Sequence, residues 1–91
     1  MMDDSEKKAV ALKYEQHSTP RVIAKGDYEI AEAMIQNAIA QGIPITSDPA
    51  LVGVLMNLEL NEEIPEELYV AVAVILSWVY WLRGDTPESL S

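Results

Sequence analysis

The 91-residue sequence contains no cysteine, no phenylalanine and only one histidine. Without cysteine, neither a disulfide framework nor a thiolate metal site can form, which fits a reducing compartment. Basic residues are also few, because six Lys and Arg stand against 15 Asp and Glu and give a net charge of −9. Phosphate binding needs clustered Lys and Arg, so this balance argues against nucleic acid and against anionic membrane surfaces. Proteins and peptides remain as partners.

Residues capable of catalysis or metal binding are isolated in the sequence. His17 lies in a polar stretch without the companions of a catalytic triad or metal site, and this is typical of a solvated loop histidine. The four glutamates between residues 62 and 67 surround a predicted helix start. Solvated carboxylates that stabilise the positive end of the helix dipole are the better interpretation there than ligands of a cation. Residues 25–27 are only a weak version of a strand–glycine–helix anion site. We expect no enzyme activity, no cofactor, no metal and no small-molecule substrate.

The hydrophobic pattern predicts a single α/β domain, a small mixed β-sheet covered by about three or four helices. Apolar runs at 9–14 and 21–25 are typical of strands, and the short loop between them makes the strands antiparallel. A helix is predicted over 27–41, with Asp27 as its cap and a glycine directly after its end. Residues 43–46 are predicted to form a third strand, parallel to the second across a right-handed crossover.

Two further helices follow the predicted third strand. Ser47 and Asp48 offer a cap and Pro49 a first helical position for a short helix. Residues 64–83 form the longest apolar stretch, in which Pro65 is expected at the first helical position and most of the circumference is apolar. We therefore predict a largely buried helix, because the stretch falls short of the roughly 18–20 apolar residues that a membrane span needs.

The ends of the chain are polar. Residues 1–8 are predicted to be a disordered N-terminal segment, residues 9–83 the domain, and residues 84–91 a C-terminal tail. The N-terminus is acidic where a signal peptide would be basic and then apolar, so we expect a cytoplasmic protein.

The order of the motifs is more specific than the composition. The sequence runs through AVALKY, RVIAKGDYEIA, GIPITSDPALVGVL and EIPEELYVAVAVILSWVYWL, with a polar loop ending in Pro20 after the first motif. This order resembles the cytoplasmic C-terminal domain of the type III export switch proteins, the flagellar FlhB family with its injectisome relatives YscU, EscU and SpaS. The resemblance extends over residues 9–82.

The sequence departs from that family at its N-terminal end. Family members carry a membrane domain ahead of this one and cleave themselves between the Asn and Pro of an NPTH motif. At the matching positions this chain reads Asp4-Ser5-Glu6-Lys7, which lacks both the asparagine that cyclises and the proline that forms the turn. We therefore expect a free-standing equivalent of the fragment that remains after cleavage.

The resemblance implies a non-enzymatic role in substrate recognition or specificity switching during flagellar or type III export. The implied partners are export apparatus proteins, the ruler protein or export substrates. The implied location is the cytoplasm, either free or peripheral at the membrane export apparatus. The implied peptide-binding residues are Thr19, Pro20, Ala73 and Leu76. Core packing is the alternative for Ala73 and Leu76, and a general protein-interaction or dimerising module is the alternative for the whole domain. An open apolar groove near Pro20 would favour peptide capture, and a filled one a plain scaffold.

Overall fold

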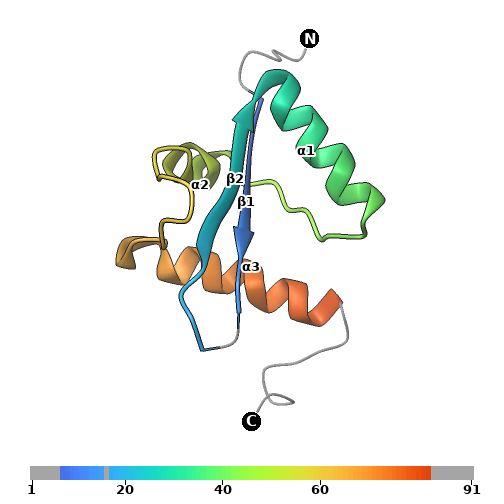
Figure 1. The fold of residues 1–91 in the computed structure, drawn as a ribbon. Coiled ribbons are helices and arrows are strands. Elements are labelled where there is room, and N and C mark those ends of the chain that lie inside the picture. Colours follow the sequence, from blue (N-terminus) through green and yellow to red (C-terminus); the bar gives the residue numbers. More distant parts are fainter. Residues whose placement is uncertain (1–6, 16, 83–91) are drawn as a thin grey trace.

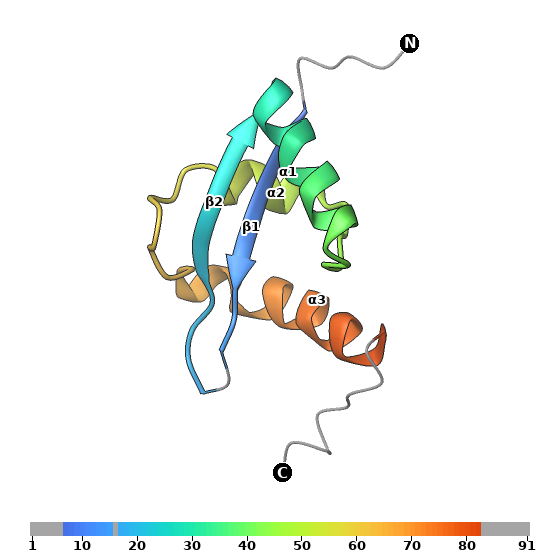
Figure 2. The same ribbon diagram turned by 45° about the vertical axis from the view of Figure 1, so that its right-hand side comes forward.

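The computed structural model describes residues 7–15 and 17–82, except for the side chains of residues 80–82. Its elements are β1 (Lys8–Lys13), β2 (Arg21–Asp27), α1 (Tyr28–Ala40), α2 (Pro49–Leu55), a 3-10 turn (Glu66–Leu68) and α3 (Tyr69–Leu82). The α1 helix begins at one end of the β1–β2 hairpin, and α3 crosses near the opposite end, where the hairpin loop lies (Figures 1 and 2). The predicted α/β class and its covering helices are confirmed.

The sheet is an antiparallel hairpin in which Lys8 pairs with Asp27 and Lys13 pairs with Arg21. The register shifts at the Ala11–Leu12 step, where β2 contributes one extra residue. Such a bulge bends the strand and increases its twist. The antiparallel pairing predicted from the short loop is therefore correct.

The predicted third strand at 43–46 is wrong, because these residues have no regular structure in the described part of the chain. Ile43 and Ile45 are 48% and 43% exposed, so they bury too little surface to hold a strand in place. Pro44 also lacks the N–H group that a ladder hydrogen bond requires. Within residues 7–15 and 17–82 the sheet is therefore two-stranded and antiparallel rather than mixed, and it lacks the predicted parallel crossover.

The segment 61–64 takes the free edge at the start of β2 instead. The Val22 N–H donates to the Glu62 carbonyl at 3.0 Å, and the Val22 carbonyl accepts from the Asn61 N–H at 2.6 Å. Arg21 and Glu63 form an antiparallel bridge. A stretch that the sequence presents as a plain linker thus satisfies the backbone of β2.

The α1 helix follows β2 without a loop. Asp27 is both the last residue of β2 and the N-cap of α1, but its side chain makes no capping hydrogen bond, which corrects the predicted role of this side chain. The Tyr28 N–H donates a hydrogen bond of 3.1 Å to the carbonyl of Lys7, the residue before β1. Gly26 permits this close junction, because a Cβ atom there would lie 2.2 Å from Cγ2 of Ile30.

The end of α1 is a Schellman motif built on the expected glycine. Gly42 has φ +70, a conformation that L-residues rarely adopt and that glycine adopts freely. The Gly42 N–H donates to the Ile39 carbonyl at 3.2 Å, and the Ile43 N–H donates to the Ala38 carbonyl at 2.9 Å. These two bonds satisfy carbonyls that the helix end would otherwise leave open.

The core lies between α2, α3 and one face of the hairpin. Its buried residues are Leu51, Leu55, Ile64 and Val72. Val10 and Leu12 of β1 pack against this cluster. As predicted, Asp48 caps α2, and its carboxylate accepts from the Leu51 N–H at 3.1 Å.

The α3 helix is less buried than its composition predicts. Pro65 is the N-cap of the 3-10 turn rather than the first helical residue, and the α-helix begins only at Tyr69. Val72 is 1% exposed, but Val70 and Val74 are 78% and 66% exposed. In so small a domain α3 meets neighbours on one side only, so an apolar circumference does not produce a buried helix. Over the residues that the structure describes, α3 and the other helices are too short or too polar to cross a membrane.

Candidate functional site

An apolar hollow of about 440 Å³ lies where the hairpin loop meets α3. The hairpin and its loop contribute one wall, α3 contributes the opposite wall, and Ile64 lies between them. The lining residues are Tyr14, Ser18, Thr19, Pro20, Ile64, Tyr69, Val72, Ala73, Leu76 and Ser77. Carbon atoms dominate the lining, with hydroxyl groups of Ser, Thr and Tyr among them.

The loop wall is held in place by its proline. Pro20 is buried and restricts Thr19 to an extended conformation. The Pro20 carbonyl accepts a hydrogen bond of 2.9 Å from the Ile64 N–H. On the other side of the loop, the Ser18 hydroxyl donates to the Glu15 carbonyl at 2.6 Å. The position of the loop therefore depends on hydrogen bonds to the backbone carbonyls of Glu15 and Pro20, one at each end of the loop.

The helical wall follows the periodicity of α3. Tyr69, Ala73 and Ser77 recur every four residues, so their side chains lie above one another on one face. Ala73 is exposed, and its small side chain leaves room in the hollow. Leu76 is half-buried and also packs against the core, so it serves the hollow and the core together.

All four residues that the resemblance implied for peptide binding line this hollow. Thr19 and Pro20 come from the loop, and Ala73 and Leu76 from α3. Their role in binding stays a prediction, whereas their placement side by side is a feature of the structure. Sequence reasoning missed the other lining residues, although the spacing of Tyr69 and Ser77 from Ala73 was a helical signal that could have found them.

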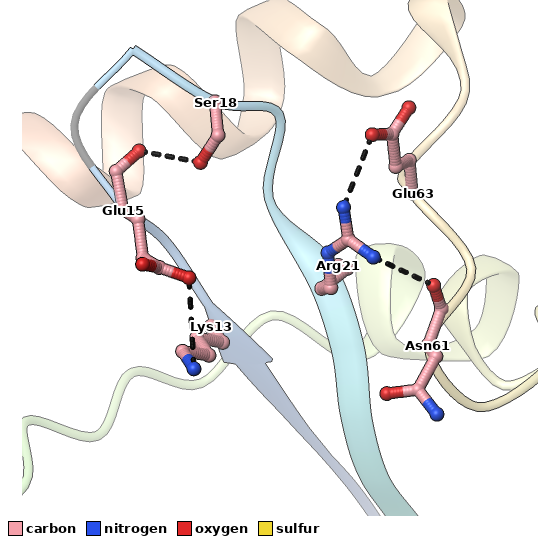
Figure 3. A network of polar contacts seen from close by, with 6 residues as sticks. All are labelled: Lys13, Glu15, Ser18, Arg21, Asn61 and Glu63. Carbon is pink, nitrogen blue, oxygen red and sulfur yellow. Dashed lines mark hydrogen bonds and ion pairs between the residues drawn. The ribbon is translucent and has the colours of Figure 1, made fainter.

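A second, polar hollow of about 410 Å³ lies on the other side of the hairpin loop and shares Ser18 with the first. Figure 3 shows the polar contacts around it. Lys13 lies 3.6 Å from a Glu15 carboxylate oxygen, and Arg21 lies 3.2 Å from Glu63. Lys13 and Arg21 are directly opposite one another in the hairpin, so these acids offset a like-charge cross-strand pair that would otherwise be unfavourable.

Arg21 also connects the hairpin to the segment before α3. Its guanidinium donates to the Asn61 carbonyl at 3.4 Å, in addition to its contact with Glu63 (Figure 3). Exposed ion pairs of this kind contribute little to stability. Their effect is to orient the loop and the linker that flank the apolar hollow.

The other candidate chemical groups are not gathered into a site. His17 is exposed in the hairpin loop. The Glu62 carboxylate accepts from the Glu59 N–H at 2.8 Å, and Glu63 contacts Arg21. Residues 7–15 and 17–82 contain no group of three or more acidic or histidine side chains arranged to hold a metal ion.

Among the residues that the structure describes, a pKa shift is resolved for Glu32 of α1, which does not line the hollow. The Lys7 ammonium hydrogen-bonds to the Glu32 carboxylate and, together with its charge, lowers the pKa of this carboxyl from its usual 4.5. The contact joins the residue before β1 to α1. It is a structural ion pair at the surface and does not resemble an acid or base prepared for catalysis.

An apolar hollow with a few hydroxyl groups can bind apolar side chains of a peptide. Comparison with known proteins identifies the family of the chain. The family model described as "FlhB HrpN YscU SpaS Family" matches residues 4–79 of this chain. The chain belongs to this export family. The expected resemblance is thus confirmed.

The relatives of this family member include one of similar length and others that are much longer. The chain is 42% identical over 78 residues to the Bacillus subtilis protein YlqH, and the match covers 84% of each chain. It is also 42% identical over 73 residues to the hypersensitivity response secretion protein HrcU of Ralstonia nicotianae, and 35% identical over 78 residues to FlhB of Escherichia coli. These two matches cover 78% and 82% of this chain but only 20% of each of those proteins.

Solved structures confirm the fold of this family member. The PscU C-terminal domain matches with a TM-score of 0.74 and 25% identity, over 80% of this chain and 96% of that chain. A mutated EscU C-terminal domain matches with a TM-score of 0.73 and 27% identity, over 78% of this chain and 89% of that chain. The chain therefore has the fold of an export-switch C-terminal domain, and its family supports a general role in flagellar or type III export.

Proposed function

We propose that this protein binds an apolar peptide segment in the hollow between the hairpin loop and α3, and thereby takes part in substrate recognition or specificity switching. The segment belongs to an export substrate, a ruler protein or another export component. The observation that carries the proposal is the open apolar hollow lined by Thr19, Pro20, Ala73 and Leu76. Its action is binding rather than catalysis, and it takes place in the cytoplasm, next to the membrane export apparatus.

Two features support a peptide as the ligand. The volume of about 440 Å³ lies in the range of ligand sites and is large enough for one or two apolar side chains. Thr19 and Ser77 line the same hollow, and their hydroxyl groups are suitable partners for a peptide backbone.

We further propose that the chain acts as a free-standing equivalent of the C-terminal fragment left by self-cleavage in its relatives. Residues 4–7 read Asp-Ser-Glu-Lys at the positions where the resemblance places the cleavage motif. YlqH, which matches over 84% of its own length, is a relative of similar extent. FlhB and HrcU align with this chain over about a fifth of their length.

Complementation in a flagellated host tests this role. The resident switch protein is truncated just before its cleavage site, and this chain is supplied in trans while swimming and filament export are measured. Restored export is expected. If a soluble, well-expressed chain restores nothing, the replacement role is wrong, and a general protein-interaction module with the same fold becomes the better interpretation.

A matched pair of alanine variants tests the hollow itself. Ala73→Asp places a charge in the hollow, whereas Ala71→Asp places the same charge at an exposed position of α3 outside the lining residues. Both side chains are exposed, so both variants should fold. Loss of export with Ala73→Asp alone is expected, and equal activity of the two variants would show that the hollow is not the working surface.

A further inference from the structure

The edge of β1 that faces away from β2 is open in the described part of the chain. Among those residues the sheet consists of β1 and β2, so β1 has a paired strand on one side only. The segment 61–64 occupies part of the opposite edge of the sheet, at the start of β2. An unpaired strand edge presents a row of N–H and carbonyl groups that can pair with another chain.

The register of the hairpin shows which residues of β1 turn their backbone groups toward the open edge. Hydrogen-bonded pairs alternate with non-hydrogen-bonded pairs along an antiparallel ladder. The Tyr28 N–H bonds to the Lys7 carbonyl, so these two residues form a hydrogen-bonded pair. Lys8 is the next residue along the ladder, so its backbone groups point away from β2, and by the same alternation those of Val10 do too.

The alternation continues past the bulge to Leu12. Leu12 pairs with Val22, and Val22 directs its N–H and its carbonyl away from β1, toward 61–62. The backbone of Leu12 therefore also points to the open edge. In the described part of the chain, the N–H and carbonyl groups of Lys8, Val10 and Leu12 have no hydrogen-bond partner. Such groups are satisfied by an extended chain or by water.

Apolar side chains lie around the open edge. Val10 and Leu12 pack against the core. The end of α1 and the segment 43–46 lie on the side of β1 that faces away from β2 (Figures 1 and 2). Ile43 and Ile45 in this segment are 48% and 43% exposed. An added strand would therefore find backbone partners in β1 and apolar surface on the same side.

Charge at the two ends of β1 limits what can pair with it. The strand begins with Lys8 and ends with Lys13, and both are exposed. Two copies of β1 paired antiparallel over their whole length would place Lys8 of one copy opposite Lys13 of the other. Like charges directly opposite are unfavourable, whereas opposite charges are favourable. Glu15 lies 3.6 Å from the Lys13 ammonium, beyond hydrogen-bond distance, so this ammonium retains its donors.

We propose that the open edge of β1 binds an extended segment of a partner protein, which adds a strand to the sheet and carries acidic residues opposite Lys8 and Lys13. Main-chain hydrogen bonds to the outward groups of β1 supply affinity, and alternate side chains of the segment supply specificity. This surface is separate from the apolar hollow, because no residue of β1 lines that hollow. The proposal therefore goes beyond peptide binding there.

Amide hydrogen exchange of the free protein, followed by NMR, tests whether the edge is open. The N–H groups of Lys8, Val10 and Leu12 should exchange at least about tenfold faster than those of Ala9 and Ala11, which bond to β2. Uniform protection along β1 would show that the edge is already covered, and the proposal would then be wrong.

A capped hexapeptide DVTVTD is the probe for binding, because its aspartates can lie opposite both lysines while valine and threonine favour a strand. Titration should protect the outward amides of β1 and leave the amides of Thr19 and Ala73 in the hollow unshifted. The matched control KVTVTK should bind about tenfold more weakly. The net charge of −9 favours the basic control at long range, so a preference for DVTVTD reports contact with the lysines.

Exchanging the charges on β1 should exchange this preference. The double variant Lys8→Glu, Lys13→Glu keeps the backbone edge and should bind KVTVTK more tightly than DVTVTD. Both side chains are exposed, so the variant should fold, and circular dichroism checks this. Should it not fold, Lys8→Gln alone should weaken the binding of DVTVTD about threefold.

Three results of the titrations would overturn the proposal. They are no binding of DVTVTD at millimolar concentration, equal binding of the two peptides, and shifts confined to the hollow. An unchanged preference in the charge-exchanged variant would show that the two lysines do not select the segment, and the acidic partner would then be wrong.

Discussion

The Nζ atom of Lys25, in β2, donates a hydrogen bond of 3.1 Å to the carbonyl oxygen of Met56, the C-cap of α2. It also donates to the carbonyl of Leu58. The carbonyls at a helix C-terminus have no partners within the helix and carry the negative end of its dipole. Lys25 therefore connects the hairpin to α2. Its ammonium group, which lies in the segment 25–27 considered as a weak anion site, binds backbone carbonyls of the protein itself.

Replacing Lys25 with methionine should lower the free energy of unfolding by about 2 kcal/mol, because hydrogen bonds to a charged group contribute roughly 1.5–3 kcal/mol. Methionine keeps most of the apolar stem, so packing is largely preserved. Lys13→Met is the control, since the Lys13 side chain is 56% exposed and its ion pair with Glu15 lies at the surface. Urea denaturation measures both variants, and equal losses would contradict the capping role.

Gly26→Ala should destabilise the protein by about 1–3 kcal/mol, the usual effect of overpacking. The new Cβ would lie 2.2 Å from Cγ2 and 2.8 Å from Cβ of Ile30, and this β-branched side chain has little freedom to move away. Gly53→Ala is the opposite case, because nothing lies within 4 Å of its Cβ. It should stabilise α2 by about 0.5–1 kcal/mol. Thermal unfolding should therefore move Tm in opposite directions for the two variants.

Gly42→Ala should lower the free energy of unfolding by about 1 kcal/mol through backbone conformation alone. The cause is its φ of +70, since its Cβ would meet nothing within 4 Å. Gly42→Asn should lose less, because asparagine tolerates the left-handed conformation better than alanine does. Denaturant unfolding would contradict the Schellman assignment if both variants matched the natural protein.

The ion pair of Lys7 and Glu32 should make a small contribution to stability that disappears in acid. The lowered pKa of Glu32 in the folded state means that the contribution is present above the unfolded pKa and is lost as the pH falls through the folded pKa. The stability difference between the natural protein and Glu32→Gln should therefore shrink between pH 7 and pH 3. A constant difference over this range would contradict the assignment.

Some local signals in the sequence were reliable, whereas the predicted capping side chain of Asp27 and the predicted helical position of Pro65 were wrong. Gly42 ended α1 as expected, and Asp48 capped α2, because caps and stops depend on neighbouring residues only. The prediction of a third strand at 43–46 was wrong because a strand depends on residues far away in the sequence. Whether an apolar run becomes a strand depends on a partner edge, and that edge at the start of β2 is taken by 61–64.

Burial was harder to predict than secondary structure. The composition of α3 predicted a largely buried helix, yet Val70 and Val74 face solvent because no described segment packs on that side. The grouping of Thr19 and Pro20 with Ala73 and Leu76 came from the family resemblance. Periodicity alone could not bring a hairpin loop next to a helix some fifty residues later.

The hydrogen bond from the Ile64 N–H to the Pro20 carbonyl has a consequence for how fast the hollow can take a ligand. It fixes the loop wall to the residue that leads into α3, so both walls are set when the chain folds. A peptide would then meet a cavity that needs no opening step, and little ordering entropy would be lost on the protein's side. Association would depend on encounter, and selectivity on how long each peptide stays.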